Sequence, residues 1–203
     1  PRAGEPFQCI NYVSCHDNHT LYDRLLNSVK DADDADRIKM HKLANTIVMT
    51  SQGIPFLHAG VEMLRTKGGE ENSFKSPDSV NQLIWTRKTQ YQEVFDYYRD
   101  LVRLRKEHPA FRLPSKALIQ KHLQFLETPE LMVAYTLSDH ANGDGWKDIL
   151  VIFNGDTQAQ SLSLHDGNWV KAFDGSGYLD APKKVPSKAV KLPASSALIL
   201  YQS

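Results

Sequence analysis

The pattern of apolar residues changes near residue 112, and this change limits the folds that the chain can adopt. Before it, two short apolar runs with strand character alternate with long stretches at helical spacing. After it, short apolar runs follow one another, separated by clusters of Gly, Asn and Asp that are typical of turns. The sequence therefore predicts an α/β region, residues 1–112, followed by an all-β region, residues 113–203.

The α/β region is predicted from a strand, a helix and a second strand. Residues 7–15 alternate as in a buried or half-buried strand, and a second apolar run over residues 54–60 has Pro55 near its start. Between them, apolar residues recur at helical spacing after an Asp-rich segment and before Gly53, which indicates an amphipathic helix. A strand, helix and strand in this order favour a parallel pair with a right-handed crossover.

A long polar segment, residues 61–87, follows the second strand, and a helix is predicted over residues 91–108. A loop of this length is usually functional or disordered. Its Asn72, Asp78, Asn81 and Gln82 suit a hydroxyl-rich ligand, but they are equally consistent with turn and cap roles. The buried face of the helix is expected to consist of Val94, Phe95, Tyr98, Leu101 and Val102.

The all-β region is predicted to be an antiparallel sandwich without helices. We find no internal repeat and no low-complexity segment in it. Several short strands at this spacing imply a sandwich domain of about 90 residues, within the usual size range of domains. The expected strands are residues 118–126, 131–137, 149–153, 160–164, 169–173, 189–192 and 197–201.

The first predicted strand ends in polar residues, His16 and Asp17. In parallel α/β sheets, catalytic side chains lie at the carboxyl ends of the strands, so an acid beside an imidazole suggests a site that faces substrate. The alternative is that Asp17 or Asn18 caps the next helix, and the local pattern alone favours that alternative.

The composition narrows the class of partner. Lys plus Arg equal Asp plus Glu at 24 each, so the charge favours a neutral or small partner over nucleic acid or an anionic membrane. No run reaches transmembrane length, and the chain opens at Pro1 without a leader, which says little about export because no Met precedes it. We expect no cofactor.

Neither a metal site nor a disulfide is expected. The Asp-rich residues 31–36 lack the glycine and terminal glutamate of a calcium-binding EF-hand loop. Cys9 and Cys15, six positions apart in one predicted strand, would lie about 20 Å apart, too far to bridge, and we expect them to be core thiols.

Two long motifs resemble a known family. Residues 10–23 closely resemble the fourth conserved region of the alpha-amylase superfamily (glycoside hydrolase family 13), in the form found in type I pullulanases. Residues 53–60, 64–67 and 72–82, with Glu62 and Trp85, resemble the segment around the last barrel strand of those enzymes. The likeness runs from about Gly4 to Phe111, and the predicted sandwich fits their C-terminal domain.

The resemblance implies the C-terminal part of a (β/α)8 TIM barrel. Residues 7–15 would be its seventh strand, residues 54–58 its eighth and residues 91–108 its last helix. The nucleophilic Asp and the acid/base Glu of the family come from earlier strands, upstream of Pro1, so this piece alone is expected to be inactive. The apolar faces of its two strands would lack cover.

The resemblance also implies roles for six residues. Asp17 would be the third catalytic acid, a transition-state stabiliser that bonds the ring hydroxyls of the reacting glucose, and His16 would bind the same sugar. Binding of the adjacent glucose and shaping of that wall are implied for Asp78, Gln82, Asn72 and Phe74. Val61, Phe74 and Ile84 stand where glutamine, tyrosine and aspartate are usual, which leaves the fine specificity open.

The leading functional hypothesis is hydrolysis of α-1,6 branch linkages in pullulan, starch or glycogen fragments. The partners would be the α-glucan and the rest of the barrel, and export is plausible for such a hydrolase. The first alternative is another member of the superfamily, of the neopullulanase, isoamylase or glycogen-debranching type. The second is a starch-binding sandwich in which Trp146 and Trp169 serve as stacking platforms.

Overall fold

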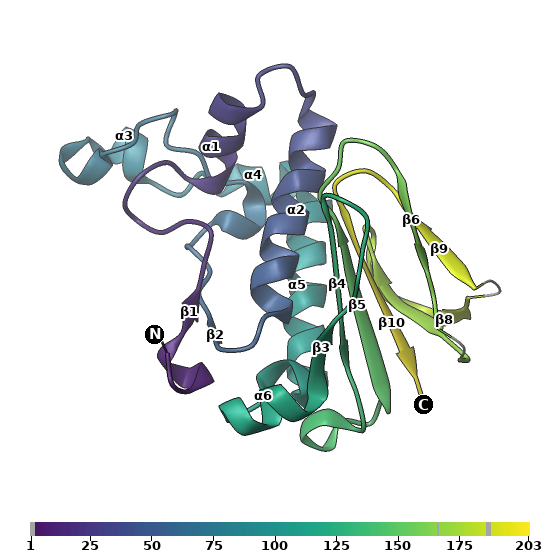
Figure 1. Ribbon diagram of the computed structural model, residues 1–203. Helices are drawn as coiled ribbons and strands as arrows, with labels where there is room; N and C mark the ends of the chain where they lie inside the picture. The colour runs from purple at the N-terminus through teal and green to yellow at the C-terminus, as the bar shows by residue number, and fades with distance from the viewer. Residues whose placement is uncertain (1–2, 166, 186–187) are drawn as a thin grey trace.

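The computed structural model describes residues 3–165, 167–185 and 188–203, and its elements form layers (Figure 1). A helical layer separates a small parallel strand pair from an antiparallel sheet, and a second small sheet covers the far face. The helices are α1 (Leu21–Ser28), α2 (Asp34–Thr50), α3 (Asp78–Asn81), α4 (Thr86–Gln90), α5 (Gln92–Glu107) and α6 (Lys116–His122). The strands are β1 (Ile10–Asn11), β2 (Ile54–Pro55), β3 (Leu123–Phe125), β4 (Met132–Leu137), β5 (Asp148–Asn154), β6 (Gln160–Ser163), β7 (Val170–Asp174), β8 (Gly177–Lys184), β9 (Ala189–Leu192) and β10 (Ser196–Gln202).

The predicted parallel pair is present but short. β1 pairs with β2 in parallel, with Ile10 opposite Ile54, and α1 and α2 form the connection. The prediction of a buried or half-buried strand over residues 7–15 is wrong outside Ile10–Asn11, because residues 6–8 form a 3-10 turn, and Ile10 itself is 61% exposed. The pair has no further strand beside it in the described chain, so the expectation of uncovered apolar faces is confirmed.

The predicted helix between these strands is confirmed as α2. The Asp33 side chain caps it by accepting from the Asp36 N–H at 2.8 Å, and Asp34 pairs with Arg37. The Asp-rich segment therefore serves as a helix N-terminus. At the other end, the buried Arg105 guanidinium donates to the carbonyls of Met49, Ser51 and Gly53 at 2.7–2.9 Å.

The polar segment after β2 is folded into short helical pieces. Two 3-10 turns, Val61–Met63 and Ser73–Lys75, precede α3 and α4 within it. The next predicted helix is confirmed as α5, and Val94, Tyr98 and Leu101 are buried as expected.

Two residues of the predicted face of α5 are not in the core, and one of them, Phe95, is only partly buried. Val102 is 40% exposed, and Tyr97 and Leu104 lie in the core. Since successive residues turn by about 100° around a helix, Val102 cannot share the seam of Leu101 and Leu104.

The all-β region contains a six-stranded antiparallel sheet of order β3-β4-β5-β10-β7-β8 and a separate β6-β9 pair. The strands predicted from residue 131 onward are all present within one or two residues of their expected bounds. The strand over residues 118–126 is wrong in its first part, which is α6, because the Ser115 hydroxyl caps a helix there. The edge strand β8 was not expected, since its Pro and Lys residues are unusual in paired strands.

The core consists of two clusters, one on each face of the large sheet. Side chains alternate between them along β5, so that Val151 packs against the helices and Ile152 against β6 and β9. The first cluster joins Leu101 and Phe111 of the helical layer to residues of the sheet. The boundary between residues 112 and 115 remains a prediction, with a continuous core on both sides of it, and residues 1–2 of the first predicted region lie outside the described residues.

Two further expectations concern the cysteines and membrane insertion. Cys9 and Cys15 are free thiols, as expected, but both are partly exposed, so the prediction of core positions is wrong. In the described residues, no helix combines the length and apolarity needed to cross a bilayer.

Candidate active site

The turn after β1 presents His16 and Asp17 to solvent. Their side chains are 84% and 68% exposed, and His16 Nε2 lies 3.3 Å from Asp17 Oδ1. The alternative that Asp17 or Asn18 caps α1 is wrong, because Thr20 takes that role, its hydroxyl accepting from the Asp23 N–H at 3.1 Å. The carboxylate of Asp17 therefore faces outward with an imidazole beside it.

A buried lysine lies beneath this turn. Lys67 is 3% exposed, and its ammonium donates to the main-chain carbonyls of Asn18 at 2.7 Å, Glu71 at 3.2 Å and His16 at 3.4 Å. An ammonium has three N–H donors, and here each has a carbonyl acceptor. Lys67 thereby connects the His16–Asp17 turn to the loop that begins at Glu71.

The segment that carries Lys67 is fastened to α1 by a buried carboxylate. Asp23 is 1% exposed and accepts from the Thr66 hydroxyl and, at 2.7 Å, from the Lys67 N–H. Asp23, Thr66 and Lys67 belong to the two motifs, but sequence reasoning gave them no role. The available signal was that Asp23 and Lys67 lie in two motifs expected to pack together, where buried charged residues need partners.

His58 and Arg65 connect the end of β2 to the same loop. Arg65 Nη1 lies 3.1 Å from His58 Nε2, and Arg65 Nη2 donates to the Asn81 carbonyl at 2.8 Å. Burial, with the positive charges of Arg65, Lys67 and His16, lowers the pKa of His58 to about 4. His58 is therefore neutral at pH 7, and its Nε2 can accept from the guanidinium.

The four predicted residues of the loop are all exposed. Asn72 precedes a 3-10 turn and Phe74 lies in it with 73% of its surface exposed, while Asp78 opens α3 and Gln82 follows it. The Gln82 N–H donates to the Asp78 carbonyl at 2.8 Å, so the two residues are one helical turn apart.

Asn81 shapes this loop from below. Its side chain accepts from the Ser73 hydroxyl and donates to the Ser73 and Ser76 carbonyls at 2.8–3.0 Å. Figure 1 shows α3 and the turn after β1 at the same end of the molecule, and the Lys67 bonds join the two segments directly. The surface combines the exposed carboxylates of Asp17 and Asp78 with neutral hydrogen-bonding groups and an exposed ring, a composition that suits a sugar.

Metal-ligand atoms also meet in this turn. Among the described residues, Cys15, His16 and Asp17 bring one ligand atom each within 4.8 Å of one another. They are consecutive residues of one turn, and His16 and Asp17 are exposed, so the cluster has neither the spacing nor the enclosure of a structural metal site.

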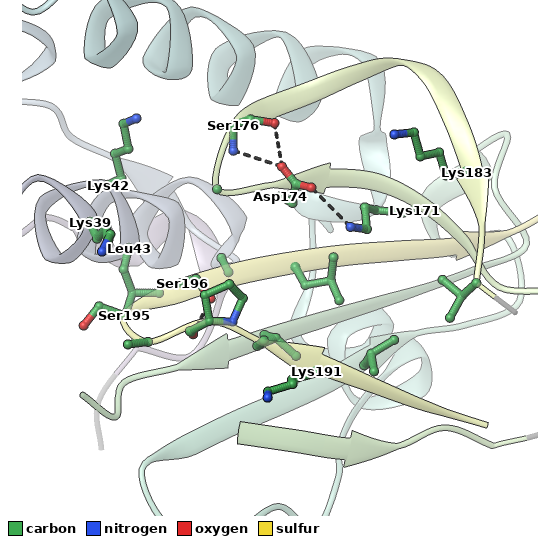
Figure 2. A pocket seen from close by; sticks show the side chains of 18 of the residues that line it. Lys39, Lys42, Leu43, Lys171, Asp174, Ser176, Lys183, Lys191, Ser195 and Ser196 are labelled. Carbon is green, nitrogen blue, oxygen red and sulfur yellow. Dashed lines mark hydrogen bonds and ion pairs between the residues drawn. The ribbon is translucent and has the colours of Figure 1, made fainter. Parts of the chain in front are cut away.

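A separate groove of about 700 Å³ lies between α2 and the strands β7 to β10 (Figure 2). Apolar residues such as Leu43 and Leu198 line it, and six lysines surround it, of which Lys171 pairs with Asp174 at 3.3 Å. None of the six predicted site residues lines this groove. Its lysines suit an anion better than a neutral glucan, so it is distinct in chemistry from the His16–Asp17 surface.

The interpretation of Trp146 and Trp169 as sugar-stacking platforms is wrong. Trp169 is 7% exposed and belongs to the second core cluster. Trp146 stacks on His108 and on Tyr201, with ring centroids 3.4 Å and 4.2 Å away. Two rings so close to one indole must lie on opposite faces, so neither face is free for a sugar.

Comparison with known proteins agrees with this architecture over the whole chain. The family described as the pullulanase all-beta domain matches residues 119–177. Pullulanase from Bacillus subtilis (strain 168) is 41% identical over 202 residues, which cover 99% of this chain and 28% of that protein. The chain thus spans less than a third of the length of this relative.

Two solved structures give the same result. Pullulanase from Bacillus acidopullulyticus is 46% identical with a TM-score of 0.95, covering 98% of this chain and 25% of that one. Pullulanase from Paenibacillus barengoltzii, in complex with maltohexaose and alpha-cyclodextrin, is 46% identical with a TM-score of 0.92, covering 98% and 30%.

The fold and these likenesses define the chain as a homologue of glycosidases. More narrowly, it is homologous to the type I pullulanases, and its residues 119–177 match the pullulanase all-beta domain.

Proposed function

We propose that this chain is the C-terminal part of a retaining glycoside hydrolase that cleaves α-1,6 branch linkages in pullulan and related α-glucans. The observation that carries the proposal is the exposed His16–Asp17 pair in the turn that follows a parallel strand, in a chain alignable with pullulanases over 98–99% of its length. The complexes of relatives with maltose and maltohexaose support an oligosaccharide ligand.

The first region, residues 1–112, would complete a (β/α)8 barrel. β1 and β2 would be its seventh and eighth strands and α5 its last helix, with residues 113–203 as the C-terminal sandwich. Phe7, Ile10, Ile54 and Phe56 are 43–63% exposed, and burying the exposed half of each against the rest of the barrel would be favourable by roughly 1 kcal/mol per residue. The barrel is therefore the first partner of this chain.

Asp17 would act on the transition state. In retaining glycosidases, a nucleophile and an acid/base carboxylate lie about 5–5.5 Å apart across the scissile bond, and we assign both to the preceding part of the enzyme. The exposed carboxylate of Asp17 would accept from ring hydroxyls of the reacting glucose. These bonds strengthen as the sugar flattens, so they raise kcat more than they tighten ground-state binding.

The loop residues would bind the neighbouring sugar. His16 would bond the reacting glucose as a neutral imidazole, and Asp78 and Gln82 would contact the adjacent glucose. Asn72 and Phe74 would form the wall of that subsite. The exposed ring of Phe74 offers a face to a sugar but no hydroxyl, so we expect it to affect KM more than kcat.

The test is Asp17→Asn in the full-length enzyme. We expect kcat on pullulan to fall by about a hundred- to a thousandfold, because a bond to the transition state is lost, with an unchanged thermal midpoint, because the side chain is exposed. Asp180→Asn, at a residue that is 94% exposed on β8, is the matched control and should retain full activity. Full activity of Asp17→Asn would contradict the assignment of Asp17 as the transition-state stabiliser.

Products distinguish the proposed activity from its nearest alternative. Cleavage of pullulan at α-1,6 bonds releases maltotriose, whereas an α-1,4-acting relative of the neopullulanase type releases panose or isopanose. The chain alone should hydrolyse neither. Hydrolysis by a pure sample of residues 1–203 would contradict the division of the catalytic acids proposed above.

A further inference from the structure

Lys67 is buried without a carboxylate among its bonded partners. Its ammonium is satisfied by three main-chain carbonyls, of which those of His16 and Asn18 flank Asp17 directly. Burying a charge costs free energy unless hydrogen bonds replace its hydration, so an ammonium in this place fixes the position of each carbonyl that it binds. Asp17 lies between two of those fixed points.

The conformation of the turn makes this constraint necessary. Asn18 has φ 61°, in the left-handed region that most residues avoid and asparagine tolerates. The side chain of Asp17 is exposed, and the neighbouring imidazole of His16 is more exposed still, so their mutual contact does little to orient it. What orients Asp17 is therefore the main chain of the turn.

Lys67 also fixes the distance to the second sugar. Its third carbonyl, that of Glu71, opens the loop that carries Asn72 and Phe74. The Lys67 backbone is itself held by Asp23, which is buried in α1. One side chain thus joins the turn for the reacting glucose to the wall for the adjacent glucose.

We propose that Lys67 is a positioning residue of the active site: its ammonium holds the main-chain carbonyls of His16, Asn18 and Glu71 so that Asp17 and the Asn72–Phe74 loop keep the spacing of two adjacent glucose units. This inference rests on the proposed function. It assigns the residue no contact with substrate, and it predicts that loss of Lys67 acts through Asp17.

The test compares Lys67→Met with Arg105→Met in the full-length enzyme. Arg105 is an equally buried cation on three main-chain carbonyls, but it lies at the end of α2 and bonds no residue of the site. Both variants should lower the thermal midpoint. Only Lys67→Met should lower kcat, by about a hundredfold with less than a threefold change in KM, because a misplacement of about 1 Å has an effect of that size.

Two further measurements separate positioning from general damage. Hydrogen exchange in Lys67→Met should accelerate at residues 16–19 and 71–74 and stay unchanged in β5. In an Asp17→Asn background, Lys67→Met should reduce the residual activity by less than threefold. A hundredfold loss in that background, unchanged exchange in the turn, or equal kcat losses in Lys67→Met and Arg105→Met would overturn the proposal.

Asn18→Ala provides a second variant if Lys67→Met does not fold. It disfavours the left-handed turn without removing a buried charge, and it should lower kcat in the same way. Wild-type kcat in this variant would overturn the inference. If instead the wild-type enzyme releases no maltotriose, or Asp17→Asn stays fully active, the proposed function itself fails.

Discussion

The two strand systems of the molecule both contain apolar residues, but their surroundings are opposite. β1 and β2 form a pair whose Ile10 and Ile54 are 61% and 46% exposed, whereas Val151 and Ile199 in β5 and β10 are fully buried. Helices cover one face of the large sheet and the β6-β9 pair covers the other. Apolar strands therefore need other elements packed against their faces. Among the described residues, the large sheet has such elements on both faces and the β1-β2 pair has exposed apolar residues.

The largest effect that tests this contrast is a cavity in the large sheet. Ile199→Ala should lower the free energy of unfolding by about 2–5 kcal/mol, because Ile199 has no exposed surface and the core cannot collapse around the gap. Urea denaturation measures the change. Ile10→Ala is the control and should change it by less than about 0.5 kcal/mol, and an equal loss in both would show that β1 is packed.

A smaller effect concerns the helical layer and pH. Burial lowers the pKa of His41 to about 3, and this histidine shares a hydrogen bond of 3.0 Å with the Tyr98 hydroxyl. The unfolded chain protonates at about 6.5, so between pH 6.5 and 3 the unfolded state binds more protons and stability falls as the pH falls.

The measurement is urea denaturation at several pH values. From pH 6.5 to pH 5, His41 alone should remove about 1.5 kcal/mol. His41→Asn keeps a group able to bond Tyr98 but does not titrate, so it should flatten this slope. An unchanged slope in the variant would assign the acid sensitivity to other groups, of which His58, with its pKa of about 4, is the first to examine.

The smallest effect on stability should come from the exposed strand pair. Ile10→Ser combined with Phe56→Ser should hardly change the unfolding midpoint of the isolated chain, yet reduce its self-association in sedimentation experiments. The same substitutions should lower the unfolding midpoint of the full-length enzyme, where we propose that the rest of the barrel buries these residues. Equal unfolding midpoints of the wild-type and the doubly substituted full-length enzyme would contradict the burial of these residues by the barrel.

Much of the fold followed from pattern alone. The periodicity of residues 38–48 and the caps around it predicted α2, and the turn clusters after residue 130 predicted the strands from β4 to β10, except β8. The errors share one cause, which is that neighbours decide exposure and pairing. Ile10 has the pattern of a buried residue and lacks a third strand, and β8 has the pattern of a loop and gains a partner in β7.

The site residues were predicted from the family resemblance, and the buried residues that hold them in place were not predicted. His16, Asp17 and the loop residues came from the resemblance, since the local pattern favoured a helix cap that Thr20 actually provides. Lys67 and Asp23 were present in the same motifs without a role. The hydrogen bonds of Lys67 to Asp23 and to the His16 and Asn18 carbonyls span 44–51 positions in the sequence, and no periodicity predicts which carbonyls a buried charge will contact.

The stack of His108, Trp146 and Tyr201 makes this protein suited to optical study. The three rings come from the end of α5, the loop before β5 and β10, so the indole emits from the place where the helical layer meets the sheet. Trp85 is 67% exposed and lies three residues after Gln82 in the proposed sugar-binding segment, and Trp169 is enclosed in the second cluster. Three single-tryptophan variants would therefore report separately on ligand arrival, on the joint between layers and on the sandwich interior.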